Sequence, residues 1–288
     1  MHPELLLFGS SRCLSLKPEI ENVNSLNVSL YAGAIEDHYC LLRYAVEDLK
    51  FPVHTVVVGL EPDLLVDNQP INPMLKRNTI LSRYLLKNDI SVAKSNFFCK
   101  PGYIDEVASL LSTTTLSDSL RVVFKYLLNI FRVSEAGAAT SENPEKSVNL
   151  IKTILEKITV EKDSLESRLR QYKNLYAGST KIDPERLQYL DDFAEYAQRH
   201  EIHVLIFIPG YSKNFWKEMH CVDSFVEIQG KFDRVIHNLV ETYGFKVIDF
   251  RPVHWRGPEL EFFDGVHPTK HTAEIIDAQI NRVISDGF

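Results

Sequence analysis

The sequence has few cysteines and no long apolar run. Its four cysteines stand far apart, with no CxxC pair, at Cys13, Cys40, Cys99 and Cys221. This usage is typical of the reduced, mostly buried thiols of a cytosolic protein rather than of a disulfide framework. No apolar run is long enough to cross a bilayer, and the first four residues are acidic rather than basic, unlike a secretory signal. We therefore expect a cytoplasmic protein without a membrane span.

The sequence also lacks an excess of positive charge. Its formal net charge is -7 at pH 7, which argues against a nucleic-acid partner. No phosphate-binding glycine loop and no dinucleotide fingerprint occur. His200 and His203 come nearest to a metal-ligand spacing, but no carboxylate or cysteine cluster accompanies them. We therefore expect neither a cofactor nor a metal ion.

The length and composition indicate one globular domain. A chain of 288 residues can bury a sizeable core, and 44% hydrophobic with 25% charged residues is ordinary for a soluble domain. Short apolar runs at residues 5–8, 27–33 and 54–60 read as buried strands, with a helix predicted over 36–50 between the last two. This opening has a βαβ pattern. We expect a single domain over residues 1–288.

The next convincing strands come much later, at residues 203–209 and 246–250, with helices predicted over 183–200, 222–243 and 270–285. The interval after the third strand is too long for one crossover helix. We therefore predict a helical insertion over residues 73–182, with a mobile loop over 134–147. An apolar stripe over 148–172 fits either a coiled-coil homodimer seam or a helix packed on its own domain, and the sequence leaves both open.

Two short stretches, at opposite ends of the chain, carry chemistry. Ser10 and Ser11 directly follow the first predicted strand, where ligands bind in parallel α/β sheets. Asp264 precedes His267 by three residues in a loop before the last helix. In such a turn the carboxylate can orient the imidazole, and the imidazole can take a proton from a serine hydroxyl. Together the two stretches predict a nucleophilic serine with its base.

With these two stretches the chain resembles the SGNH hydrolases, also called the GDSL family. The resemblance implies a three-layer flavodoxin-like fold with a five-stranded parallel sheet, here with the large insertion between strands 3 and 4. It selects Ser11, two residues after Gly9, as the nucleophile, with Asp264 and His267 completing the triad. It also implies that the backbone N–H groups of Ser11 and Gly33 hold the oxyanion.

The sequence departs from the family pattern after the third strand. The family usually places an asparagine two residues after the strand-terminal glycine, as a third oxyanion donor, but here Gly59 is followed by Glu61. An ionised carboxylate only accepts hydrogen bonds. Three explanations stay open: Glu61 pairs with Arg12 and serves architecture or substrate hydroxyls, it is protonated in a dry site, or the site works with two donors.

Two aromatic residues complete the candidate site. Tyr211 belongs to an aromatic-rich loop predicted over residues 210–216, after the fourth strand, which reads equally as a substrate wall or as apolar cover for the sheet edge. Trp255, shortly before Asp264, lines the pocket or lies on a surface loop. We assign Tyr211 and Trp255 to substrate binding, together with Arg12 and Glu61.

The resemblance implies a serine-dependent ester hydrolase that works through an acyl-enzyme on a small or glycan ester. A carbohydrate O-acyl ester is the expected substrate, because relatives with a Gly-Ser-Ser-Arg start are linked to surface-glycan modification. An O-acyltransferase would use the same triad with a sugar hydroxyl in place of water. The alternative from another class is a catalytically silent binding module, for which Glu61 is the main argument.

Overall fold

The protein is described by a computed structural model over residues 2–31, 33–66, 81–85, 164–177 and 181–287. Five strands form one parallel sheet: β1 (Leu5–Phe8), β2 (Ser25–Asn27), β3 (Thr55–Gly59), β4 (His203–Ile208) and β5 (Lys246–Asp249). Their order is β2-β1-β3-β4-β5, which is the flavodoxin-like order. The predicted fold is thereby confirmed.

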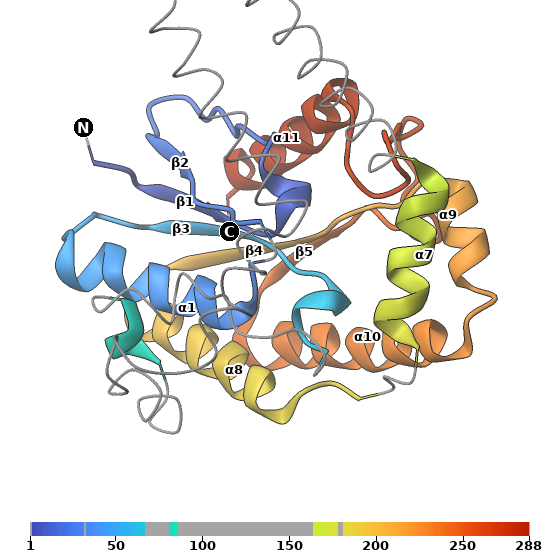
Figure 1. Ribbon diagram of the computed structural model, residues 1–288. Coiled ribbons are helices and arrows are strands. Elements are labelled where there is room, and N and C mark those ends of the chain that lie inside the picture. The colour runs from blue at the N-terminus through green and yellow to red at the C-terminus, as the bar shows by residue number, and fades with distance from the viewer. Residues whose placement is uncertain (1, 32, 67–80, 86–163, 178–180, 288) are drawn as a thin grey trace, which may run out of the picture. The chain divides into compact units, whose positions relative to one another are not determined.

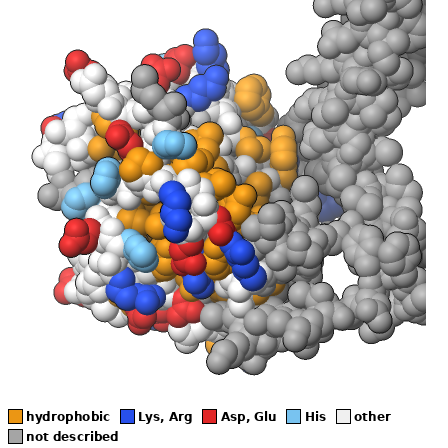
Figure 2. All heavy atoms as spheres, turned by 90° about the vertical axis from the view of Figure 1, so that its left-hand side faces the viewer, with side chains coloured by type: hydrophobic (Ala, Val, Ile, Leu, Met, Phe, Trp, Pro, Cys, Tyr) orange, Lys and Arg blue, Asp and Glu red, His pale blue; other side chains and the backbone are white. Residues whose placement is uncertain are grey.

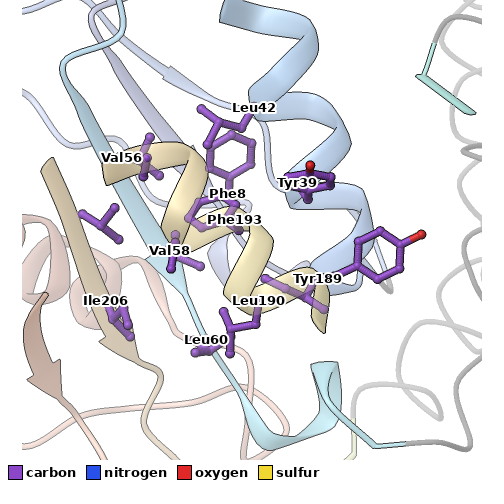
Figure 3. Close-up of a cluster of buried hydrophobic side chains, with 14 of the residues drawn as sticks. Phe8, Tyr39, Leu42, Val56, Val58, Leu60, Tyr189, Leu190, Phe193 and Ile206 are labelled. Atoms are coloured by element: carbon purple, nitrogen blue, oxygen red, sulfur yellow. The ribbon is translucent and has the colours of Figure 1, made fainter. Parts of the chain in front are cut away.

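Helices cover both faces of this sheet (Figure 1). Side chains alternate along a strand, so Leu6 and Phe8 point to one face while Leu5 and Leu7 point to the other. Helices α1 (Ile35–Arg43), α8 (Pro184–Arg199) and α10 (Asp223–Tyr243) pack on the first face, and α11 (Lys270–Ser285) packs on the second. Figure 3 shows the first of these cores, in which Phe193 of α8 meets Phe8 edge to face.

Two further helices of the described residues lie toward the carboxyl ends of the strands. They are α7 (Leu165–Tyr176) and α9 (Lys213–Met219), which contact each other and share a third apolar cluster with the start of α10. The face at which the strands begin shows apolar side chains mixed with charged ones (Figure 2). No helix in the described ranges combines the length and apolar character that crossing a bilayer requires.

The structure corrects two predicted boundaries. Strand β2 covers Ser25–Asn27 rather than residues 27–33. Regular pairing with β1 ends at Asn27, whose side chain accepts the N–H of Ser29, although the N–H groups of Val28 and Leu30 still donate to the carbonyls of Leu7 and Gly9. The predicted loop over 210–216 is also wrong in part. Ser212 caps a helix by accepting the N–H of Phe215, so residues from Lys213 onward belong to α9.

The predicted insertion over residues 73–182 falls mostly outside the described residues, as do the loop over 134–147 and the first part of the apolar stripe. The last part of that stripe is helix α7. Its side chains Leu165, Leu169 and Tyr172 pack into the third apolar cluster of this chain. The homodimer through the insertion therefore stays a prediction, and α7 itself packs within its own domain.

Two glycines allow a close approach between the first turn after β1 and the sheet. A Cβ added to Gly9 or Gly59 would collide with the buried side chain of Cys13, and at Gly59 it would also lie 2.9 Å from Phe207 Cζ. Both glycines end strands that meet at the point where the sheet order reverses. The turn that follows β1 can therefore lie directly over the ends of β1 and β3.

We expect Gly59→Ala to lower the free energy of unfolding by about 1–3 kcal/mol, since it overpacks this contact. Gly230→Ala is the matched control, because Gly230 lies inside α10 with open space where its Cβ would be. That control should raise stability by about 0.5–1 kcal/mol. Denaturant unfolding of both variants measures the difference, and a Gly59→Ala protein as stable as the wild type would contradict the close approach.

Candidate active site

The turn after β1 presents Ser11 at the carboxyl edge of the sheet. Ser10 caps a single 3-10 turn, Ser11–Cys13, by accepting the N–H of Arg12 at 3.2 Å. Ser11 takes the first position of that turn, so its own N–H is among those with no acceptor inside the helix. The edge between β1 and β3, where this turn lies, is the switch point at which flavodoxin-like sheets bind their ligands.

The loop before α11 holds Asp264 and His267 together. Asp264 Oδ1 accepts the backbone N–H groups of Val266 at 3.1 Å and His267 at 2.9 Å. Its other oxygen, Oδ2, lies 2.8 Å from His267 Nδ1. Gly265, with a φ of 95°, supplies the left-handed backbone conformation that this tight loop needs. One carboxylate thus fixes both the loop and the imidazole ring.

The two ends of the chain meet at a serine–histidine contact. Ser11 Oγ lies 2.9 Å from His267 Nε2, although 256 positions separate the residues. Asp264 is only 1% exposed. Burial works to raise the pKa of its carboxyl, but the hydrogen bonds and charge of His267 and the charge of Arg168 hold this pKa well below its usual range.

The protonation of this chain of contacts follows from Asp264. Because an ionised carboxylate only accepts hydrogen bonds, we assign the ring proton to Nδ1, which donates to Asp264. The Nε2 atom then carries a lone pair, and the Ser11 hydroxyl donates to it. The arrangement can therefore draw the proton from the serine oxygen and make it nucleophilic.

Arg12 and Glu61 form a buried ion pair beneath this contact. Arg12 Nη1 lies 2.8 Å from Glu61 Oε2, and both side chains are 2% exposed. The Ser10 hydroxyl donates to the second oxygen, Glu61 Oε1. Burial alone would lower the pKa of the Arg12 guanidinium, but the nearby Glu61 carboxylate holds it well above its usual range. Of the three explanations for Glu61, the structure contains the pairing with Arg12.

The remaining donors of Arg12 join other loops of the site. Its Nε donates to the carbonyl of Val266 at 3.2 Å, and its Nη2 donates to the carbonyl of Gly210. Its guanidinium lies 4.3 Å from the centroid of the Tyr211 ring. Arg12 therefore connects the turn after β1, the segments that follow β3 and β4, and the loop that carries His267. These contacts occupy Arg12 and Glu61 within the protein, and their predicted role in substrate binding stays a prediction.

The predicted oxyanion glycine lies beside the turn after β1. A Cβ on Gly33 would be 3.3 Å from the Gly9 carbonyl oxygen, which places Gly33 next to the end of β1. Its N–H donates to the carbonyl of Leu30 at 3.2 Å. An oxyanion bound here would have to share the Gly33 N–H with the Leu30 carbonyl, so the N–H of Ser11 is the more available of the two predicted donors.

The two aromatic residues lie in different places. Tyr211 is buried under Arg12 and stacks on Phe215 of α9 with ring centroids 5.4 Å apart. The Trp255 ring packs on Phe250, 4.8 Å between centroids, and its indole N–H donates to the carbonyl of Pro258. Tyr211 thus belongs to the base of the site, whereas Trp255 joins the apolar cluster on the α11 face of the sheet.

Two further residues reach the site from parts of the sequence with no motif. Arg168 of α7 donates from Nε to Asp264 Oδ2 at 2.7 Å. Asp63 accepts the hydroxyl of Tyr176, also on α7, and burial together with the charge of Glu61 raises the pKa of Asp63 to about 6. The partners in these two contacts are 96 and 113 positions apart in the sequence, so no local spacing predicts the contacts.

The described residues contain no group of three or more His, Cys, Asp or Glu arranged to hold a metal ion. Cys13 and Cys40 are buried free thiols and Cys221 is exposed, while Cys99 lies outside the described residues.

Comparison with known proteins finds matches among solved structures alone, since no family model and no curated protein matches the chain. A GDSL-like lipase from Bacteroides thetaiotaomicron is 11% identical with a TM-score of 0.42, covering 99% of this chain and 88% of its own. A lipase/acylhydrolase from Enterococcus faecalis is 12% identical with a TM-score of 0.43, covering 98% and 95%.

A putative acylhydrolase from Bacteroides fragilis is 9% identical with a TM-score of 0.41, covering 99% of this chain and 90% of its own. The first of these names contains the family term GDSL, and the other two are acylhydrolase names. At such identities and TM-scores the likeness carries no assignment of activity. The case for the site rests on its own geometry.

Proposed function

We propose that this protein is a serine-dependent acyl-ester hydrolase. The observation that carries the proposal is the continuous chain of contacts from Ser11 Oγ to His267 Nε2, at 2.9 Å, and from His267 Nδ1 to Asp264 Oδ2, at 2.8 Å. These distances are those of a nucleophile, its base and the group that orients the base. Ser11 follows β1 at the switch point of the strand order, where sheets of this kind bind ligands, and this position supports the proposal.

The mechanism follows from these contacts. His267 Nε2 takes the hydroxyl proton as Ser11 Oγ forms a bond to the ester carbonyl carbon, and the imidazolium that results is stabilised by Asp264. The Ser11 N–H donates to the oxyanion, with Gly33 as the second predicted donor. His267 then gives its proton to the departing alkoxide, which leaves Ser11 acylated. Water, deprotonated by His267, attacks the acyl carbon, and His267 returns the proton to Ser11 Oγ as the bond to the acid breaks.

A carbohydrate O-acyl ester is our preferred substrate class, on the strength of the Gly-Ser-Ser-Arg motif at residues 9–12. An O-acyltransferase would complete the same cycle with a sugar hydroxyl in place of water. Adding a free sugar to an assay with a small acetyl ester distinguishes the two reactions, because a transferase would convert part of the acyl-enzyme into acylated sugar that mass spectrometry detects.

The silent binding module is the less favoured proposal. Its main argument was the carboxylate of Glu61 where an oxyanion donor is usual. The pairing of Glu61 with Arg12 and Ser10 gives that carboxylate a structural use that leaves the Ser11–His267 contact intact. A binding module has no need for the two triad contacts at hydrogen-bond distances.

Ester hydrolysis should fall on the acid side of its pH profile. A protonated imidazole cannot accept the Ser11 proton, and histidines ordinarily take up that proton between about pH 8 and pH 5. Because the pKa of Asp264 is held well below its usual range, Asp264 stays ionised here and adds no second limb. Initial rates on a neutral ester test this, beside His267→Ala. Activity that survives His267→Ala would exclude the proposed triad.

A further inference from the structure

The carboxylate of the triad has a second cationic neighbour. Arg168 Nε lies 2.7 Å from Asp264 Oδ2, the same oxygen that His267 Nδ1 contacts at 2.8 Å. The Arg168 side chain is 13% exposed and that of Asp264 is 1% exposed, so solvent screens this pair only weakly. The guanidinium and the imidazole therefore both donate to one carboxylate oxygen.

Packing holds Arg168 in this place. Ser164 caps the start of α7 by accepting the N–H of Ser167, and Leu165 lies against Gly265, directly after Asp264. One turn beyond Arg168, Tyr172 meets Phe215 of α9 edge to face, with ring centroids 5.0 Å apart. A second donor of Arg168, Nη1, bonds Gln171 Oε1 at 2.7 Å. The guanidinium is thus fixed along α7 and aimed at the loop of the triad.

Resting on the proposed function, we infer that Arg168 is a positioning residue that orients Asp264 and weakens its attraction for a proton on His267. Two physical effects support this role. A planar guanidinium donating to Oδ2 restricts the carboxylate to the orientation in which it meets the imidazole. The positive charge of Arg168 also offsets part of the negative charge that Asp264 presents to the ring.

Arg168 is the cation from outside the triad loop that is paired with Asp264 among the described residues. Among the described residues, the charged groups at the Asp264 carboxylate are His267, from its own loop, and Arg168, from α7. Arg12, from the turn after β1, reaches the nearby carbonyl of Val266, but its charge is paired with Glu61. Ser11 completes the contacts of the imidazole. Arg168 is accordingly the group whose removal should alter the proton equilibrium of the triad.

The test is the second-order rate constant for inactivation by a fluorophosphonate, measured against pH for wild type, R168Q and R168K. R170Q is the control, because Arg170 lies two positions along α7 with an exposed side chain. R168Q should move the acid limb to higher pH by roughly one unit, since a charge within about 4–6 Å has effects of about that size. Its plateau rate should fall roughly tenfold, less than the hundredfold that a misplacement of about 1 Å can cause.

R168K keeps the charge without the fixed fork of donors, so its acid limb should stay near that of the wild type while its plateau rate falls. R170Q should match the wild type in both. An acid limb in R168Q that coincides with the wild-type limb would overturn the inference and leave Arg168 as an anchor of α7. If R168Q does not fold, an unchanged plateau in R168K overturns it. A wild type that does not react would instead count against the proposed function.

Discussion

Ser11→Ala should abolish ester hydrolysis, lowering kcat by a factor on the order of 10⁵ to 10⁶. The variant keeps the fold, because Ser11 is partly exposed and loses a single hydroxyl, but it has no atom to form the acyl-enzyme. Residual turnover would come only from the oxyanion donors and substrate binding. Initial rates on a small acetyl ester measure the loss.

Ser15→Ala is the matched control, because Ser15 lies four positions further along the same segment with an exposed side chain. Its activity should equal that of the wild type. Ser10→Ala distinguishes the two adjacent serines: Ser10 donates to Glu61 rather than to His267, so its loss should reduce activity without abolishing it. If Ser10→Ala abolished activity and Ser11→Ala retained it, the nucleophile would be Ser10 and not Ser11.

Glu61→Ala should be the most destabilising single change in the site, lowering the free energy of unfolding by about 3–5 kcal/mol. The change leaves the guanidinium of Arg12 buried without its carboxylate, and Arg12 at the same time joins four segments of the site. Denaturant unfolding followed by circular dichroism measures the loss. The double change Arg12→Met with Glu61→Met should recover most of the stability, because the buried charge is then removed together with its partner.

Glu259→Ala provides the matched control for burial. The Lys213–Glu259 pair has the same 2.8 Å separation as Arg12–Glu61, but its side chains are 79% and 72% exposed. Exposed pairs contribute little, so this variant should unfold at the same denaturant concentration as the wild type. Equal losses in Glu61→Ala and Glu259→Ala would show that the buried pair has no special part in holding the site together.

Much of the fold could be predicted from the sequence because its signals are local. The apolar runs of β1, β3, β4 and β5 and the cap at Asp183 that starts α8 each depend on a few neighbouring residues. The predicted bounds of β2 differ from the observed ones because Val28 and Leu30 are apolar enough to extend the pattern, whereas regular pairing with β1 ends at Asn27. Helix α9 was missed because its signal is the cap at Ser212 inside an aromatic-rich segment.

The candidate site also contains residues that local sequence signals predict and residues that they do not. Asp264 and His267 were predictable because a three-residue spacing brings both side chains to one turn, and Ser11 because strand ends meet at one edge of the sheet. Arg168 had no such signal, since its contact depends on where α7 packs. The sequence leaves the pairing of Arg12 with Glu61 as one of three explanations. The choice depends on how the two side chains pack, and the structure contains the ion pair between them.

The most direct test of an activated Ser11 is the intact mass of the protein after incubation with a fluorophosphonate, beside Ser11→Ala, with the labelled peptide identified. The account predicts a single adduct, located on Ser11 and absent from the variant, because His267 and Asp264 make this serine nucleophilic. No adduct under conditions that label a control serine esterase would contradict it and favour the silent binding module.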